Sequence, residues 1–65
     1  MIILGLDPGL ANTGYGAISC DRRSPRLHSM GAVKTTPNDH VPRRLFQIHS
    51  DLTLLLRKLK PDLVA

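Results

Sequence analysis

The sequence predicts an α/β fold: a mixed sheet made of a three-stranded antiparallel meander, one crossover helix and the start of a fourth strand. Three observations lead to this prediction. Three short apolar segments follow one another with short links, which is typical of a meander. Apolar residues then recur at helical spacing over about five turns. A last apolar segment, 63–65, follows the helix, and a helix crossover joins parallel strands.

Composition narrows the class of protein. The 65 residues include nine Lys and Arg against five Asp, which gives a net charge of +4 at pH 7. This balance fits a nucleic-acid partner, although small domains also carry such charge for solubility. The single cysteine, Cys20, excludes an intrachain disulfide and a multi-cysteine zinc site. The sequence shows no apolar run of membrane-spanning length and no secretory signal, so we expect no membrane association and a cytoplasmic location.

The first two strands are predicted over 1–7 and 13–20. The run Met-Ile-Ile-Leu-Gly-Leu before Asp7 is typical of a strand buried on both faces at the centre of a sheet. Asp7-Pro8-Gly9 predicts the turn that follows. In the second strand, Gly14 and Gly16 fall on one face and leave it bare, as happens where another backbone or a ligand approaches closely.

A polar hairpin loop over 21–25 and a weaker third strand over 26–35 come next. The helix is predicted over 42–59, with Pro42 at its first position and Pro61 ending it. Positive charge in its last turn favours the helix dipole. We expect the fourth strand, from Asp62, to lie parallel to the first strand and beside it. The helix stripe expected to pack on the sheet consists of Leu45, Ile48, Leu52 and Leu55.

These elements leave apolar surface without cover. Phe46 and Leu54 lie off the helix stripe, and three strands with part of a fourth do not close a sheet. We therefore expect 1–65 to be the N-terminal part of a single longer domain, whose remainder or a partner chain covers these side chains. The alternative is that single exposed apolar residues need no cover.

Asp7 is the first candidate for chemistry. It ends an apolar strand, which is where α/β sheets place ligand-binding and catalytic groups. A carboxylate there can bind Mg²⁺, which takes oxygen ligands. The alternative is a turn aspartate that accepts hydrogen bonds from backbone N–H groups.

The other candidates carry weaker signals. The glycines at 9, 14 and 16 match neither a dinucleotide-binding fingerprint nor a P-loop, so hairpin and packing roles are favoured. The three histidines have no ligand spacing, and Cys20 has no partner base, so structural or solvated roles are favoured. Two arginine pairs could bind phosphates but are also common as solvated features. These side chains are His28, His40, His49, Arg22, Arg23, Arg43 and Arg44.

Two motifs resemble the start of the RuvC family, the bacterial Holliday junction resolvases or crossover junction endodeoxyribonucleases. They are Gly5-Leu6-Asp7-Pro8-Gly9 and, at the right distance, Thr13-Gly14-Tyr15-Gly16. The resemblance continues through Pro42, Arg44-Leu45 and Lys60-Pro61-Asp62-Leu63-Val64-Ala65, and so covers the whole chain. The stretch 22–39 matches only in pattern.

The resemblance implies an RNase H-like fold and metal-dependent hydrolysis of four-way junction DNA in recombination and repair. It implies a homodimer, the branch-migration proteins RuvA and RuvB as partners, and two Mg²⁺ ions per site, with Mn²⁺ as a substitute. Four carboxylates hold the ions in such enzymes, and Asp7 matches the first. The second is a glutamate just beyond the strand at 62–65, and the others lie further on, so we expect the 65-residue chain alone to be inactive.

Two other classes remain open from the sequence. Actin-like ATPases and sugar kinases share this sheet topology, but they usually carry Ser or Thr just after the glycine, where this chain has Leu10 and Ala11. The second class is a non-catalytic piece that only binds nucleic acid or protein.

Overall fold

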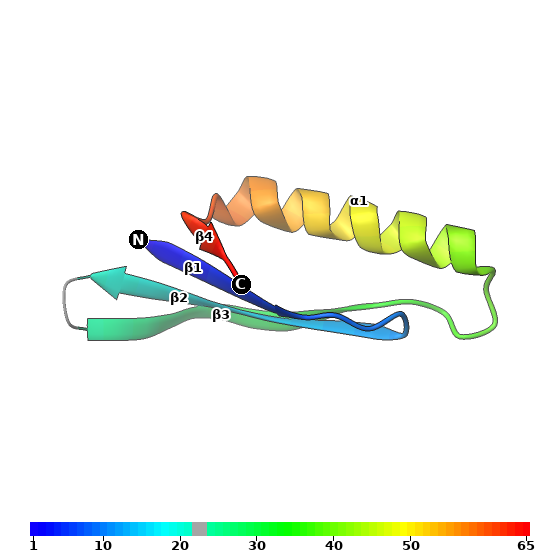
Figure 1. Ribbon diagram of the computed structural model, residues 1–65, viewed down its shortest axis with the longest axis horizontal. Helices are drawn as coiled ribbons and strands as arrows, with labels where there is room; N and C mark the ends of the chain where they lie inside the picture. Colours follow the sequence, from blue (N-terminus) through cyan, green and yellow to red (C-terminus); the bar gives the residue numbers. More distant parts are fainter. Residues whose placement is uncertain (22–23) are drawn as a thin grey trace.

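The computed structural model describes residues 1–21 and 24–65. A single sheet has the strand order β3-β2-β1-β4, and the helix α1 lies over one of its faces (Figure 1). β1 pairs antiparallel with β2, β2 antiparallel with β3, and β4 parallel with β1. The predicted meander, crossover helix and parallel fourth strand are confirmed. The elements are β1 (Ile2–Asp7), β2 (Asn12–Asp21), β3 (Ser24–Lys34), α1 (Val41–Leu59) and β4 (Leu63–Val64).

The paired strands of the β2–β3 hairpin are longer, and its loop is shorter, than predicted. Asp21 pairs with Ser24 and Cys20 with Pro25, so the loop expected over 21–25 is wrong at both ends. Proline lacks the N–H that a central strand must donate, but β3 is an edge strand and tolerates it. Residues 22–23, the first arginine pair, lie outside the described residues.

The core lies between α1 and the face of the sheet that carries the even-numbered residues of β1. Leu4 and Ala17 are completely buried, and Leu59 from the end of α1 packs with them. Burying a leucine of this kind is worth about 1.5–3 kcal/mol. Tyr15 and Leu55 pack around this cluster and are partly buried. The core is therefore small and concentrated at the C-terminal end of the helix.

Helix α1 begins one residue earlier than predicted. His40 is the N-cap residue and makes no side-chain capping bond, and Pro42 stands at the second helical position rather than the first. The C-cap residue of the helix is Lys60, whose backbone is left-handed with φ 48° and whose N–H donates to the Leu56 carbonyl oxygen at 2.8 Å. Pro61 follows, as the sequence predicts.

The helix stripe packs on the sheet over only part of its length. Ile48, Leu52 and Leu55 are half-buried, but Leu45 is 55% exposed, so its predicted place in the core is wrong. The N-terminal half of the helix lies beyond the cluster formed by Leu4. Leu45 there lines an open groove of about 320 Å³ together with Pro8, Gly9, Leu10, Thr13 and Ile48.

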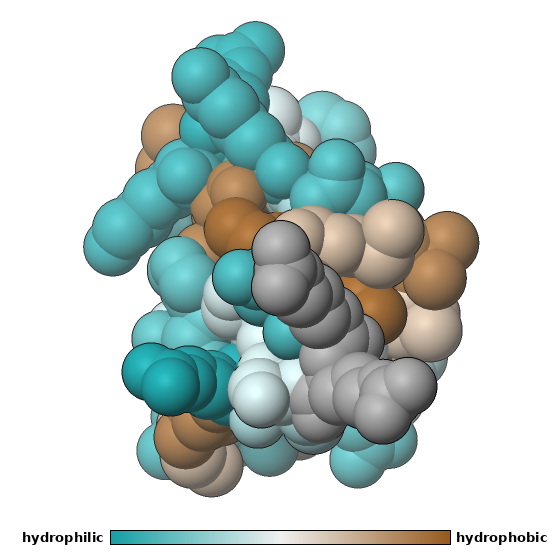
Figure 2. All heavy atoms as spheres, turned by 90° about the vertical axis from the view of Figure 1, so that its left-hand side faces the viewer, coloured by the Kyte–Doolittle hydropathy of each residue, from teal (hydrophilic) through white to brown (hydrophobic). Residues whose placement is uncertain are grey.

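The opposite face of the sheet has no helix against it in the described residues (Figure 1). The prediction that β1 is buried on both faces is therefore wrong for this chain, and Ile3 is only half-buried. Phe46 and Leu54, predicted to lie off the helix stripe, are 70% and 63% exposed. At the end of the molecule that carries the β2–β3 hairpin, apolar atoms reach the surface in patches between polar ones (Figure 2). No described helix has the length and hydropathy needed to cross a membrane.

Candidate active site

Asp7 is the last residue of β1, and its side chain lies on the face of the sheet away from α1. Side chains alternate along a strand, and Leu4 and Leu6 belong to the cluster under the helix. Asp7 pairs with Gly14 on β2, and a Cβ built on Gly14 would lie 3.9 Å from the Asp7 Cβ. The residue is exposed, and none of the described residues donates a hydrogen bond to its carboxylate or forms an ion pair with it.

The turn after Asp7 is held by Thr13 instead. The buried Thr13 hydroxyl donates to the Gly9 carbonyl oxygen at 2.9 Å, and the Gly9 N–H donates back to it at 3.3 Å. A Cβ on Gly9 would lie 2.7 Å from the Asn12 carbonyl oxygen, so the turn has room only for glycine. The structure therefore does not show the alternative, in which the Asp7 carboxylate accepts hydrogen bonds from backbone N–H groups of the turn.

A second threonine ties this turn to β3 and to the helix. The Thr35 N–H donates to the Ala11 carbonyl oxygen at 3.1 Å, and its hydroxyl donates to the Leu10 carbonyl oxygen at 2.7 Å. The Arg44 Nε–H in turn donates to the Thr35 hydroxyl at 2.9 Å. The backbone just beyond Asp7 is thus fixed by hydrogen bonds from two other elements.

The surface next to Asp7 is almost free of side chains. Gly5, Gly14 and Gly16 lie side by side on neighbouring strands, and we call these three residues the glycine floor. A Cβ on Gly16 would meet nothing within 4 Å. The floor, Asp7, Met30 and Ala65 line a shallow cavity of about 430 Å³. The bare face predicted from Gly14 and Gly16 is confirmed, and it lies beside the candidate catalytic carboxylate.

β4 runs along the other side of β1 toward Asp7. Ile3 pairs with Leu63 and Leu4 with Val64. The Ala65 N–H donates to the Leu4 carbonyl oxygen at 2.8 Å, and the Leu6 N–H donates to the Ala65 carbonyl oxygen at 2.7 Å. A strand continuing in this register would bring its second residue after Ala65 opposite Asp7. That residue would share the face of the Asp7 side chain at the strand spacing of about 4.8 Å.

The described residues do not by themselves form a metal centre. No group of three or more His, Cys, Asp or Glu side chains among them is placed to hold an ion. Asp7 nonetheless suits one position in such a centre, because it is an oxygen donor facing an open cavity. Mg²⁺ commonly takes one or two protein carboxylates and completes its shell with water and substrate phosphate oxygens.

Among residues 1–21 and 24–65, the other candidate side chains are not gathered near Asp7. His28, His40 and His49 are exposed on β3, at the N-cap and on the helix, and Cys20 is a half-buried free thiol. Arg43 is exposed and lies 3.7 Å from Asp39 one helical turn before it. Arg44 is half-buried and engaged with Thr35, so the two members of this pair differ in role.

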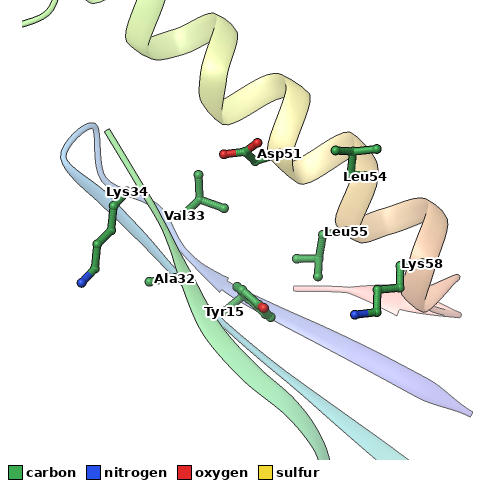
Figure 3. A pocket seen from close by; sticks show the side chains of 8 residues that line it. All are labelled: Tyr15, Ala32, Val33, Lys34, Asp51, Leu54, Leu55 and Lys58. Carbon is green, nitrogen blue, oxygen red and sulfur yellow. The ribbon is translucent and has the colours of Figure 1, made fainter. Parts of the chain in front are cut away.

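A second cavity, of about 300 Å³, lies on the helix side of the sheet (Figure 3). Tyr15 from β2 and Val33 from β3 face Asp51, Leu55 and Lys58 from the helix across it. The Tyr15 ring covers Gly31, since a Cβ built on Gly31 would lie 2.7 Å from the Tyr15 hydroxyl oxygen. This cavity is separated from the Asp7 side chain by the sheet itself.

Sequence reasoning missed the roles of Thr13, Thr35 and Asp62. In the sequence, Thr13 stands out only as part of the Thr-Gly-Tyr-Gly motif, and Thr35 only as the last residue of the predicted third strand. A threonine four residues after a Pro-Gly turn glycine is a usable signal, because its hydroxyl can bond the turn backbone. The bonds made by Thr35 join segments 25 residues apart, and no local pattern reports them.

Comparisons with known proteins agree on one family. The family described as crossover junction endodeoxyribonuclease RuvC matches residues 3–65. The RuvC protein of Prochlorococcus marinus strain SARG is 44% identical over the whole chain, which spans 43% of that protein. RuvC of Syntrophomonas wolfei is 42% identical, and the chain spans 38% of it. The solved structure of T. thermophilus RuvC in complex with a Holliday junction substrate matches 98% of this chain and 41% of its own, with a TM-score of 0.88 and 29% identity.

Proposed function

Because the chain belongs to the RuvC family, we propose that its gene product is a structure-specific endonuclease that cuts four-way DNA junctions in recombination and repair. The observation that carries this proposal is the exposed Asp7 carboxylate, which ends β1 beside the glycine floor. The chain spans about 40% of the relatives it matches, so in this proposal the activity belongs to a longer polypeptide that includes 1–65.

In this proposal, Asp7 is a catalytic residue and a direct ligand of a divalent metal ion. The ions, two Mg²⁺ with Mn²⁺ as a substitute, would polarise the scissile phosphate and supply the attacking water as a nucleophile. One carboxylate cannot hold two dications about 3.5–4 Å apart against their mutual repulsion, so other carboxylates must join it. The register of β4 supports a glutamate at the second position beyond Ala65 as the nearest of them.

The role of this chain's own residues is to hold Asp7 and leave room beside it. The β1–β2 ladder and the Thr13 bonds fix the backbone on both sides of the carboxylate. The glycine floor leaves the adjacent surface open for a sugar-phosphate backbone or for the part of the domain that completes the site. Orienting a reacting group in this way can account for a large share of rate enhancement.

The partners follow from the same proposal. The substrate is a four-way DNA junction, and the net charge of +4 favours a polyanion. The complete protein acts as a homodimer, which matches the two-fold arrangement of the strands in a junction, and it works with the branch-migration proteins RuvA and RuvB. Its place of action is the cytoplasm. The actin-like reading is not supported, because Leu10 and Ala11 offer no hydroxyl and their carbonyl groups are bonded to Thr35.

Four measurements test this function. Reading the codons after Ala65 should show Ile or Val followed by Glu. The gene product in its natural length should cut a synthetic four-way junction in Mg²⁺ and leave a linear duplex of the same sequence intact. The 65-residue chain should cut neither in Mg²⁺ or Mn²⁺, and it should not bind ATP. A natural-length protein that is inert on junctions in both ions contradicts the proposal, and nuclease-free 1–65 that turns over junctions contradicts the need for further carboxylates.

A further inference from the structure

Asp62 joins the start of β4 to the start of β1 by two hydrogen bonds. Its carboxylate oxygen Oδ2 accepts a bond from the Ile2 N–H at 2.8 Å, and its own N–H donates to the Ile2 carbonyl oxygen at 2.8 Å. Both polar backbone groups of Ile2 are therefore engaged by a single residue. The side chain serves as an acceptor where the β1–β4 ladder begins.

The chain reaches Asp62 along a path with little freedom. Lys60 adopts the left-handed conformation, its N–H closes the helix on Leu56, and Pro61 has a fixed φ. Asp62 is the first residue after this exit that bonds to β1. Asp62 makes the first bonds of this ladder, and the bonds of Ala65 to Leu4 and Leu6 continue it.

The starting point of β4 decides which side chains meet at Asp7. The observed register sends the second residue after Ala65 to the position opposite Asp7, on the same face. A slip of one residue would turn that side chain to the helix face and put its neighbour opposite Asp7 instead. A metal centre shared between β1 and an extended β4 would then lose one of its ligands.

We propose that Asp62 is a positioning residue that sets the register of β4 against β1, and thereby holds the next metal-binding carboxylate beside Asp7. This inference rests on the proposed function for its catalytic consequence. The register role itself concerns only hydrogen bonds among residues of this chain. It can therefore be measured separately from cleavage.

The test compares Asp62→Ala with Asp62→Asn in the natural-length gene product. Asparagine keeps an oxygen acceptor for the Ile2 N–H, whereas alanine removes it. Asp51→Ala is the matched control, since it removes the same charge from the helix, away from β4. The first readout is amide hydrogen exchange at Ile2, Leu6 and Ala65, measured by NMR in the absence of metal. The second is the Mg²⁺ concentration that gives half-maximal junction cleavage.

We expect Asp62→Ala to lose protection at these amides and to need about 10- to 100-fold more Mg²⁺, as loss of a group that orients metal ligands does. Asp62→Asn and Asp51→Ala should resemble the parent protein in both readouts. Parental protection and Mg²⁺ response in Asp62→Ala would overturn the inference. An Asp62→Asn protein as impaired as Asp62→Ala would also overturn the inference. If Asp62→Ala fails to fold, Asp62→Asn still tests the inference, because it keeps the oxygen acceptor. A parent without nuclease activity contradicts the proposed function alone, because the exchange data still test the register.

Discussion

Asp7 and Gly14 face each other across the β1–β2 ladder, and a Cβ on Gly14 would approach the Asp7 Cβ to 3.9 Å. The carboxylate therefore has no side chain on its β2 flank. On its other flank, the bonds of Ala65 to Leu4 and Leu6 lead β4 toward it. The side of Asp7 next to β2 is therefore open, and a continuation of β4 in the same register would lie on the other side.

This relationship predicts the effect of a side chain at position 14. Gly14→Val should lower junction cleavage by the natural-length protein about 10- to 100-fold, because a small displacement of a catalytic group has effects of that size. The added Cβ would be in ordinary van der Waals contact with the Asp7 Cβ and would meet no backbone atom within 4 Å, so the fold should persist. The two methyl groups beyond it would occupy the open space beside the carboxylate. Ala32→Val, on the neighbouring strand opposite Gly14, is the matched control and should leave cleavage unchanged. Equal rates for Gly14→Val and the parent would show that the floor has no role.

Alanine substitutions at Gly9 and Gly16 should distinguish a glycine that the turn geometry requires from one that lies beside open space. Gly9→Ala should destabilise the protein by about 1–3 kcal/mol, because its Cβ would lie 2.7 Å from the Asn12 carbonyl oxygen and the backbone would have to shift. Gly16→Ala, whose Cβ meets nothing within 4 Å, should change stability by no more than about 0.5 kcal/mol. Urea unfolding of the two variants compares them directly, and equal losses would contradict the geometry of the turn.

The helix exit predicts a stabilising substitution. Lys60 holds φ at 48°, a conformation that costs a non-glycine residue about 1–2 kcal/mol. Lys60→Gly should therefore raise the free energy of unfolding by up to about 1 kcal/mol, after the greater flexibility of glycine in the unfolded chain is offset. Lys58→Gly, inside the last turn, should lower it by a similar amount. Thermal unfolding checks the sign, and a lower midpoint for Lys60→Gly would contradict the left-handed cap.

The isolated 65-residue chain should be loosely folded or should associate through its apolar surfaces. Phe46 and Leu54 stand out from the helix, and only Leu4, Ala17, Val33 and Leu59 are buried apolar residues in the described part of the chain. Light scattering should give a mass above that of a monomer, and hydrogen exchange in α1 should be fast. The double variant Phe46→Ser/Leu54→Ser should reduce the association. A strictly monomeric chain with strong protection in α1 would show that these residues need no cover.

The sequence was sufficient for the order and direction of the elements. The 4-3 spacing of leucines and Ile48, bounded by Pro42 and Pro61, predicts the helix because both signals are local. The crossover rule gives the direction of β4, which is parallel to both β1 and β3. The predicted partner was β1, and the structure confirms this pairing. The RuvC resemblance in the segments around Asp7 and Gly14 was matched by the family comparison.

Other features depend on contacts between distant segments, which local patterns do not report. Leu45 has the same periodic signal as Leu52, yet it is exposed because the helix extends beyond the buried cluster. The local sequence around Pro25 predicts a loop, and only its edge position in the sheet allows it to be in a strand. The Asp62 bond to Ile2 spans 60 residues of sequence. The sequence predicts Asp62 as the start of the fourth strand, but no local pattern indicates this side-chain bond.

The most direct test of the account is junction cleavage by the natural-length Asp7→Asn variant. Asparagine keeps the shape of the side chain and removes the charge that a divalent ion requires, so cleavage in Mg²⁺ should fall by about three orders of magnitude or more while junction binding in a gel-shift assay remains at the parental level. Asp51→Asn carries the same change on the helix and should cut at the parental rate. If Asp7→Asn cuts four-way junctions as fast as the parent, Asp7 is not a metal ligand of the reaction and the assignment of the site is wrong.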